Sequence, residues 1–575
     1  MYRTTVNPNL SADPSNPVTS LSNPEFYRHA FRYILAFFAL LMILLISTSF
    51  KRSTGDLNTL VPEYLSAGAT DSLRGIILTV ESFDQPIIHG EKIMAFENVR
   101  NFYTLNHFVP VWTHSKGLSR KANNLLDLLE HARDYGLEPL HYHLSAIREK
   151  QQTLKVQTPD VPQVDLGTEL ELLMTDAALC FMVNLRAGFT AFDTTLFSKQ
   201  WFTALPSILV QGISQGRVQE TILSVQPRFV EYNQLQKATE NFLNTNQLTD
   251  QWTEISYPVS DSVLLRKQIK EVLITLGYLA KGRHEDDVTE ALKQFQHFHG
   301  LEPDGKPGKN TVEALAQSTL YRYRRLALNL DRLRKQEVSD STMLYVNIPA
   351  YRLKIFSRNS LRDTFRIIVG HPDSPTPQLT ARMDRIIANP VWYVPKSITM
   401  NEILPKIKSD TGYLRRNGFK ILDDNYQTVN ENSINREELS ADNFNYTLRQ
   451  SRGSDNALGK VKFIFSNPYA VYLHDTPSKA LFSKDIRAFS HGCIRVQDPE
   501  RLASFIVREV NAEDTDMIGL IGNGHHAEID INATLPIHIR YITCEADETG
   551  NLFFYKDIYG LDKKDLEELR SFMGI

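Results

Sequence analysis

The apolar residues of this 575-residue chain follow three different patterns along its length. Near the start, residues 34–46 are all apolar, and residues 33–50 carry no charge. A helix of this length is just long enough to cross a bilayer. Basic residues stand on both sides of the run, so charge does not decide its orientation. We expect residues 33–50 to be an uncleaved transmembrane anchor. A cleaved signal peptide is the alternative, but the leader before the run is long and no clear A-x-A site follows it.

The second pattern is helical and dominates the chain from residue 95 to 255. Apolar residues recur there at helical spacing. Gly136 and Pro139 are expected to end the first strong helix, and Gly188 the second. Residues 1–32, which contain several Asn-Pro and Asp-Pro pairs, are expected to be a disordered cytoplasmic tail. The periodic residues are Leu125, Leu126, Leu128 and Leu129 in the first helix and Leu170, Leu173, Met174, Ala177 and Phe181 in the second.

Residues 258–318 predict a separate unit of three short helices. The first two, at 263–276 and 287–299, are each followed by a glycine that can end a helix. A Pro-Asp-Gly turn comes next. The third helix follows this turn, and Asn310 can cap its N-terminus.

The third pattern, strand-like alternation, begins after a linking helix at 319–340. Residues 343–346 and 353–356 flank a Pro-Ala-Tyr turn and predict a hairpin. Residues 386–388 and 391–394 are expected to continue the same sheet.

Between residues 395 and 459 the alternation stops, and charged helical stretches and a polar run replace it. A segment this long inside a compact domain is usually functional, although a solvated insertion is the alternative. Beyond it, residues 461–465 and 470–474 predict a hairpin around an Asn-Pro turn. His474 would then lie at the end of a strand.

Composition mainly excludes classes of function. The net charge is −4, so electrostatics indicates neither nucleic acid nor an acidic polymer as a ligand. The length suggests roughly three to four domains. Three cysteines, Cys180, Cys493 and Cys544, are too few for a disulfide framework and lack metal-ligand spacing. Cys180 and Cys544 lie in apolar runs and are expected to be buried; whether they pair in an oxidising compartment stays open.

The segment from His474 to Cys493 carries the strongest chemical signal. His474 is followed after 15 residues by Ser-His-Gly-Cys at 490–493, and then by Arg495. A thiolate is a strong nucleophile, and a neighbouring imidazole can take its proton and later return one to a leaving group. Gly492 can let the backbone turn and aim N–H groups at an oxyanion. A buried cysteine and a structural histidine are the alternative interpretation.

This motif and its flanks resemble the YkuD-type L,D-transpeptidases, cysteine enzymes that cross-link peptidoglycan. Within that family the likeness is to the large, periplasmic YcbB-like branch, and it runs through most of the chain after residue 95. Residues 258–318 are similar to the small three-helix peptidoglycan-binding module. The flanks that carry the resemblance are Asn389–Trp392, Asn456–Gly459, Lys462–Phe463 and Tyr472–Pro477.

The resemblance implies a multidomain α+β fold after the transmembrane helix. The catalytic domain is expected to be mainly β, and a lid is expected to cover its substrate groove. The expected domains are a helical scaffold at 51–257, the three-helix module at 258–318, the linking helix at 319–340, the YkuD-type catalytic domain at 341–540 with its lid at 395–459, and a C-terminal segment at 541–575.

The resemblance also implies acyl transfer in two steps. Cys493 would attack the peptide carbonyl of meso-diaminopimelate in a tetrapeptide donor stem and expel the terminal D-Ala. The diaminopimelate amine of an acceptor stem would then resolve the thioester into a 3→3 cross-link, with His474 as the base and without cofactor or metal. Two alternatives stay open: a hydrolase with the same acyl-enzyme (an L,D-carboxypeptidase or a wall-tether-cleaving amidase), and a non-catalytic wall-binding scaffold.

Further residues receive expected roles. The backbone carbonyl of Asp475 should orient His474, because successive side chains on a strand face opposite sides. The N–H groups of Gly492 and Cys493 would form the oxyanion hole. His491 is more simply a brace of the turn than a second base. The expected substrate contacts are Ser490, Arg495, which could bind a stem carboxylate bidentately, Tyr472 and Trp392.

A wall-modifying domain must lie outside the inner membrane. The resemblance therefore implies a single-pass inner-membrane protein of a Gram-negative bacterium, with its catalytic domain in the periplasm. The expected partners are peptidoglycan stem peptides, the inner membrane and cell-wall synthases, and carbapenems are expected to acylate Cys493. Whether the 258–318 module binds glycan is left open.

Overall fold

The computed structural model describes most of the chain between residues 66 and 573. The described ranges are 66–79, 86–88, 90–114, 117–156, 163–189, 199–255, 257, 261–282, 285–336, 342–436, 438–440, 443–511, 515–531 and 535–573. Residues from Ala69 onward form one compact unit. The expected tail and membrane anchor, 1–32 and 33–50, lie outside the described residues. None of the described helices is long and apolar enough to cross a membrane.

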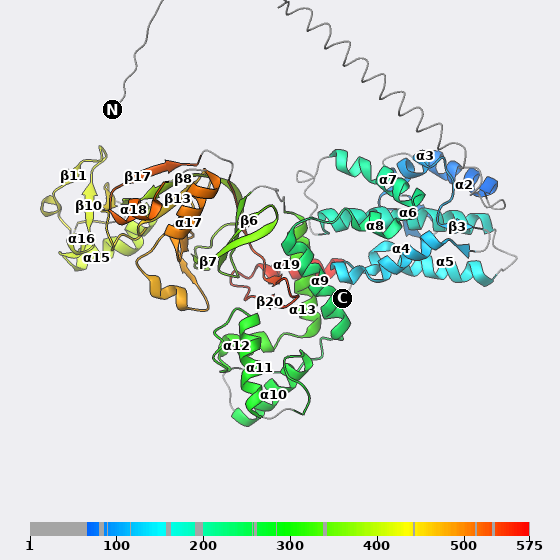
Figure 1. The fold of residues 1–575 in the computed structure, drawn as a ribbon, viewed down its shortest axis with the longest axis horizontal. Helices are drawn as coiled ribbons and strands as arrows, with labels where there is room; N and C mark the ends of the chain where they lie inside the picture. Colours follow the sequence, from blue (N-terminus) through cyan, green and yellow to red (C-terminus); the bar gives the residue numbers. More distant parts are fainter. Residues whose placement is uncertain are drawn as a thin grey trace, which may run out of the picture. The chain divides into compact units, whose positions relative to one another are not determined.

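Helices gather around α6 in the region before residue 250, as the helical spacing predicts (Figure 1). α6 ends at Ala187, directly before Gly188 with its positive φ of 84°. The buried carboxylate of Glu171 in α6 accepts hydrogen bonds from the N–H groups of Val111 and Trp112, at 2.9 and 2.7 Å. A buried charge needs such partners. The helices are α2 Ser66–Thr79, α3 Phe96–Leu105, α4 Arg120–Glu130, α5 Leu144–Val156, α6 Gln163–Ala187, α7 Lys199–Ser214, α8 Val218–Leu223 and α9 Val230–Thr245.

Three short helices with their own apolar core form the next unit: α10 Ser262–Thr275, α11 Glu285–Phe298 and α12 Lys309–Leu315. The Asp261 carboxylate caps α10 by accepting hydrogen bonds from two backbone N–H groups of its first turn. The prediction that Asn310 caps the third helix is wrong. That helix begins after Gly308, and the Asn310 side chain instead accepts a hydrogen bond from Lys556 Nζ at 2.7 Å.

Helix α13, Thr319–Arg334, lies in the expected linking helix of residues 319–340 and is buried along most of its length. Its arginines are held by hydrogen bonds from several directions. Arg325 donates to the carboxylate of Asp562 at 3.1 Å, and Arg334 donates to the carbonyl of Tyr135. α13 therefore binds the C-terminal helix on one side and the N-terminal helical region on another.

The region after residue 341 is built on a sheet whose pairing closes on itself. Strands pair in the order β13-β14-β16-β7-β6-β5-β18-β8, and β8 pairs again with β13. The predicted hairpin of residues 343–346 and 353–356 is confirmed as antiparallel β5 and β6. α17 (Pro499–Phe505) and α18 (Met517–Gly522) add side chains to the same core. The strands are β5 Met343–Asn347, β6 Arg352–Ser357, β7 Ser360–Gly370, β8 Leu379–Ala388, β13 Val461–Phe465, β14 Leu473–His474, β15 Ala488–Ser490, β16 Ile494–Val496, β17 Ala527–Asp530 and β18 Pro536–Arg540.

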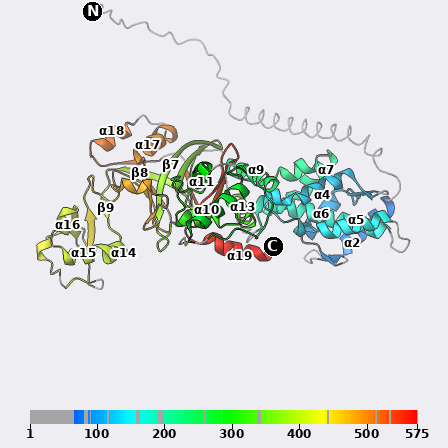
Figure 2. The same ribbon diagram turned by 90° about the horizontal axis from the view of Figure 1, so that it is seen from below.

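The segment from 395 to 459 has a core and a sheet of its own. Its four-stranded sheet has the order β11-β10-β12-β9, and its helices α14–α16 lie close to β9 (Figure 2). The prediction that residues 391–394 continue the main sheet is wrong, because β9 pairs with β12 of the insertion instead. The elements are β9 Trp392–Tyr393, α14 Lys396–Ile398, η4 Thr399–Ile403, α15 Leu404–Ser409, α16 Tyr413–Arg416, β10 Phe419–Leu422, β11 Thr428–Val429, η5 Glu431–Ser433 and β12 Thr447–Gln450.

The C-terminal segment is a hairpin, β19 Cys544–Ala546 and β20 Leu552–Phe554, followed by α19 Leu561–Met573. Cys544 is fully buried, as the sequence predicts, whereas Cys180 in α6 is only partly buried. Cys180, Cys493 and Cys544 are all free thiols in this structure.

Candidate active site

Alternation along β13 and β14 presents polar side chains on one face of the hairpin. Lys462 and His474 are direct cross-strand partners, whereas the neighbouring pair, Phe463 and Leu473, is buried in the core. Side chains two residues apart on a strand share a face. Tyr472 therefore lies beside His474, and the centroids of their rings are 5.5 Å apart. The ammonium nitrogen of Lys462 lies 4.0 Å from the centroid of the Tyr472 ring.

The imidazole of His474 is buried and held in one orientation. Its Nδ1 lies 2.5 Å from the backbone carbonyl oxygen of Asp475, which is the contact that the sequence predicts. A carbonyl accepts only, so Nδ1 carries the proton and Nε2 is left as the basic atom. Burial, together with the charges of Arg495 and Lys462, lowers the pKa of His474 to about 3, although the hydrogen bond to the Asp475 carbonyl opposes this. The resting imidazole is therefore neutral at physiological pH.

The carboxylate of Asp475 points away from the imidazole and is used elsewhere. It accepts hydrogen bonds from the N–H groups of Lys460 at 2.9 Å and Thr476 at 2.7 Å, and from Lys479 Nζ at 2.5 Å. The side chain thus fixes the backbone on both sides of His474, and the carbonyl of Asp475 orients the ring.

Cys493 reaches the same face because β16 lies parallel to β14. His474 pairs with Arg495 and Leu473 with Ile494, so Cys493 stands beside Tyr472. The backbone N–H and the hydroxyl of Tyr472 both form hydrogen bonds with the sulfur. Burial raises the pKa of the Cys493 thiol, and these bonds oppose the rise. The resting pair is therefore a neutral thiol and a neutral imidazole.

In the turn before Cys493, Ser490 and Gly492 form hydrogen bonds that the sequence did not predict. Ser490 is buried, and its hydroxyl donates to the carbonyl of Cys493 at 2.5 Å while it accepts from the N–H of Gly492 at 3.2 Å. Ser490 therefore braces the turn, and its expected contact with substrate stays a prediction. The Gly492 N–H is occupied by this hydroxyl. Gly492 has a φ of +105°, which favours glycine, and its carbonyl accepts from Thr376 Oγ1 at 2.8 Å.

His491 and Arg495 project from the two sides of the nucleophile. His491 is half-exposed, and its Nε2 contacts the carboxylate of Glu402 from the insertion. The guanidinium of Arg495 is largely buried, and its Nε is a buried donor without a hydrogen-bond partner among the described residues. A buried donor without a partner is costly unless a ligand supplies an acceptor.

Trp392 and Tyr472, the two expected groove residues, are joined to each other. A hydrogen bond from Trp392 to the Tyr472 hydroxyl partly opposes the rise in the tyrosine pKa that burial and Cys493 cause. Trp392 also packs on Phe419, at 6.3 Å between ring centroids, and so links the site face to the core of the insertion.

Two charged residues near Cys493 were not predicted as site residues. Lys462 was noted only as part of the family resemblance, yet burial lowers the pKa of its ammonium and Cys493 opposes this. Its cross-strand position opposite His474 could have identified it. Glu402 gave no sequence signal, because it comes from a helical turn about 70 residues before His474, the start of the motif.

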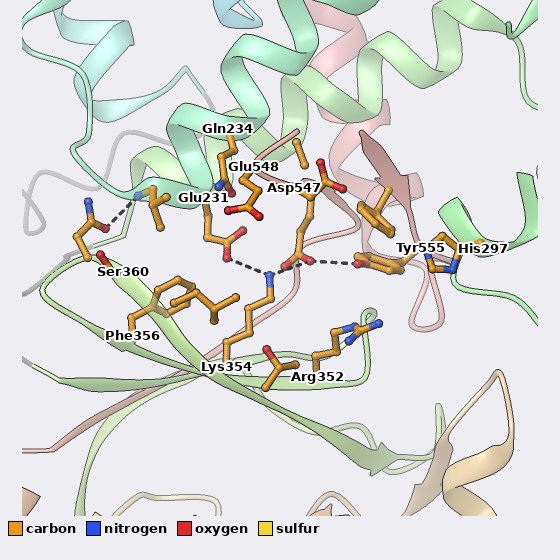
Figure 3. Close-up of a pocket in the computed structure, with 17 residues that line it drawn as sticks. Glu231, Gln234, His297, Arg352, Lys354, Phe356, Ser360, Asp547, Glu548 and Tyr555 are labelled. Carbon is orange, nitrogen blue, oxygen red and sulfur yellow. Dashed lines mark hydrogen bonds and ion pairs between the residues drawn. The ribbon is translucent and has the colours of Figure 1, made fainter. Parts of the chain in front are cut away.

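A cavity of about 600 Å³ lies away from the catalytic motif (Figure 3). Lys354 of β6 projects into it and forms ion pairs with Glu231 of α9 at 2.9 Å and Glu545 of β19 at 3.1 Å. Tyr555 donates to Glu545 at 3.1 Å. Across the described ranges, no group of three or more His, Cys, Asp or Glu side chains is placed to hold a metal ion.

Comparison with known proteins identifies three regions of the chain. Residues 97–238 match the family model "Scaffold domain", residues 264–315 match "Putative peptidoglycan binding domain", and residues 341–516 match the YkuD model, "L,D-transpeptidase catalytic domain". A Haemophilus influenzae protein named "Putative L,D-transpeptidase" is 34% identical over 241 residues, which is 42% of this chain and 48% of that relative. The match thus spans about half the length of the relative. Residues 341–516, which contain His474 and Cys493, are thus similar to the YkuD family of L,D-transpeptidase catalytic domains.

Proposed function

We propose that this chain is an L,D-transpeptidase that forms 3→3 cross-links between peptidoglycan stems through a thioester on Cys493. The observation that supports this most is the β14–β16 pairing. It brings Cys493 and His474 onto one face, with the imidazole oriented by a backbone carbonyl and the sulfur held by Tyr472.

In the first step, the Cys493 sulfur attacks the carbonyl carbon between diaminopimelate and D-Ala in the donor stem. Nε2 of His474 takes the thiol proton as the carbon–sulfur bond forms. The backbone N–H of Cys493 stabilises the oxyanion, because the Gly492 N–H is already bonded to Ser490. His474 then gives the proton to the departing nitrogen, the carbon–nitrogen bond breaks, and D-Ala leaves as a free amino acid.

The cations around the site connect donor binding to this proton transfer. Burial holds the pKa of His474 low in the resting site, and the charges of Arg495 and Lys462 add to this effect. A stem carboxylate bound to Arg495 would offset these charges and raise the pKa of the imidazole, because opposite charges nearby favour its protonated form. Donor binding thus prepares His474 to accept the thiol proton.

In the second step, the amine of an acceptor diaminopimelate attacks the thioester carbonyl. His474 removes a proton from the attacking nitrogen, the new amide bond forms, and the carbon–sulfur bond breaks to restore the thiol. The net reaction joins two stems and releases one D-Ala. If water attacks instead, the same intermediate gives a shortened stem and a carboxypeptidase activity.

The test is product analysis with purified protein and tetrapeptide muropeptides. We expect 3→3 dimers and free D-Ala by mass spectrometry, and a covalent adduct when the protein is weighed after incubation with a carbapenem. Shortened stems without dimers would make the enzyme a hydrolase. No adduct and no product would support the non-catalytic scaffold.

The location and the module belong to the same proposal. Residues 33–50 would anchor the chain in the inner membrane with the catalytic domain in the periplasm, and the three-helix module would hold glycan near the site. Co-sedimentation with purified sacculi, with and without residues 258–318, tests the module. Fractionation of cells and protease access from the periplasm test the anchor.

A further inference from the structure

Glu402 brings a negative charge from the insertion to the mouth of the catalytic site. It lies on η4, Thr399–Ile403, a turn of π-helix, and such turns are frequent at functional sites. Its carboxylate contacts Nε2 of His491, two residues before the nucleophile, and both side chains are about half exposed. The contact thus joins the insertion directly to the catalytic turn.

The other charges near Cys493 are positive. Lys462 and Arg495 both interact with the sulfur and with His474. Burial lowers the pKa of Arg495, and the charges of Cys493 and Glu402 oppose this effect. The Asp475 carboxylate does not serve the site, because backbone N–H groups and Lys479 use it on the far side of the imidazole.

This arrangement of charges favours binding of the donor stem over binding of the acceptor. A donor stem carries carboxylates, which Lys462 and Arg495 attract. The acceptor brings an amine, which is protonated in water at neutral pH. An ammonium that approaches Cys493 meets two fixed cations, so the cationic site by itself disfavours the acceptor.

We propose that Glu402 is the acceptor-binding residue, which receives the acceptor ammonium at the mouth of the site and holds it beside the thioester. One proton passes from the ammonium to solvent to free the amine, and His474 takes the second as the amide bond forms and passes it to the departing sulfur. The inference rests on the proposed transpeptidation. The His491–Glu402 contact of the resting enzyme holds the carboxylate over the catalytic turn before the acceptor arrives, and the ammonium then takes the place of the imidazole.

Glu402→Gln tests this role, because it removes the charge and keeps the shape. The donor acylates Cys493 at a rate within about twofold of the wild type. The KM for the acceptor stem rises roughly three- to fivefold, the worth of one half-exposed ion pair. The ratio of dimer to hydrolysed stem falls by the same factor, and added salt reduces the difference between the two proteins.

Two controls separate charge from damage to the insertion. Glu431→Gln removes another carboxylate of the insertion, one that pairs with Arg415 at 3.3 Å, and leaves the acceptor KM unchanged. Hydroxylamine, which is uncharged at neutral pH, attacks the thioester equally fast in wild type and Glu402→Gln. An equal loss with hydroxylamine and with the acceptor stem would show that Glu402 only shapes the insertion.

The outcomes distinguish this inference from the proposed function. If the wild type forms dimers and Glu402→Gln forms them with an unchanged acceptor KM, Glu402 does not bind the acceptor, although the enzyme is a transpeptidase. If the wild type forms no dimers with any acceptor, both the proposed function and this role are overturned.

Discussion

Tyr472 contacts three other groups of the site, Cys493, Lys462 and His474. Its backbone and hydroxyl bond to the sulfur of Cys493, and its ring lies between Lys462 and His474. The sequence marked it only as a candidate groove wall. Alternation along one strand predicts that Tyr472 and His474 share a face. The sulfur reaches them through pairing between strands about 20 residues apart, which local patterns do not specify.

The protonation states lead to a prediction about thiol reactivity. Burial raises the pKa of Cys493, so the thiolate fraction is small at neutral pH and increases as the pH rises. Alkylation of Cys493 by iodoacetamide, followed by mass spectrometry of its peptide, should accelerate with pH through and above the ordinary thiol range. Tyr472→Phe removes a hydrogen bond that lowers this pKa, so its profile should move to higher pH. A rate that stays constant down to acidic pH would indicate a resting thiolate–imidazolium pair instead.

Cys493→Ala should abolish both turnover and the carbapenem adduct, because Cys180 and Cys544 lie away from the site in other parts of the fold. The melting temperature should change little, since Cys493 is only partly buried. Intact-mass measurement of the adduct is the readout, and a wild-type yield of adduct on this variant would overturn the assignment of the nucleophile.

His474→Ala and Asp475→Asn should separate catalysis from support. Loss of the base should slow acylation by a factor on the order of 10² to 10⁴. Asp475→Asn keeps the backbone carbonyl that orients the ring. It should slow acylation far less and instead lower stability by about 1–3 kcal/mol, since buried donors lose their carboxylate. Stopped-flow acylation and chemical denaturation measure the two effects. Equal rate losses would show that the carboxylate itself orients His474.

At the scale of elements, the sequence predicted most features that depend on local hydrophobic periodicity and on residues that end a helix or strand. The helix end at Gly188 and the β5–β6 hairpin are confirmed, because a glycine stop and an alternating pair of runs are local features. The features that were predicted wrongly depend on contacts with residues far away in the sequence. β9 alternates like a strand of the main sheet, but the partner it finds is β12 of the insertion. Asn310 has the chemistry of a cap, yet its side chain is bonded to Lys556.

The insertion supports a prediction of its own. It has an independent apolar core, and Trp392 and Glu402 connect it to the site. A lid that excludes water would prolong the thioester until an amine arrives. Shortening residues 395–459 should therefore leave Cys493 reactive to a carbapenem but shift products from dimers to hydrolysed stems. An unchanged product ratio, determined by chromatography of the muropeptides, would make the segment a solvated insertion.

At the scale of the whole molecule, buried charges join regions that are far apart in the sequence. Lys354 forms ion pairs with Glu231 of α9 (Figure 3) and with Glu545 of β19. The three side chains come from three separate segments, so no sequence pattern could have assembled them. Burial tends to raise the pKa of Glu231, and Lys354 opposes this. The Lys354 ammonium therefore stabilises the carboxylates of Glu231 and Glu545 at this junction.

Lys354→Met should destabilise the protein strongly, because it leaves two buried carboxylates without their cation. The expected loss is about 3–5 kcal/mol in the free energy of unfolding, measured by denaturant titration. The exposed pair of Arg385 and Glu528 provides the control, since Glu528→Gln should cost less than about 1 kcal/mol. If Lys354→Met lowers the free energy of unfolding no more than the control does, the junction is hydrated and easily rearranged.

The parallel pairing of β14 with β16 also determines which part of the catalytic motif is free to vary. The base and the nucleophile stand on neighbouring strands, so the hydrogen-bond ladder fixes their separation, whatever the length of the chain that connects them. The number of residues between His474 and Ser490, which is 15 here, therefore does not set the distance between the base and the nucleophile. Extra residues are expected to be tolerated best in their exposed part, at Ser483 and Lys484, provided that the Lys484 carbonyl still accepts the hydrogen bond from the buried Arg487. Evolution, or an engineer, can build a new recognition loop at this point of the motif without disturbing its chemistry.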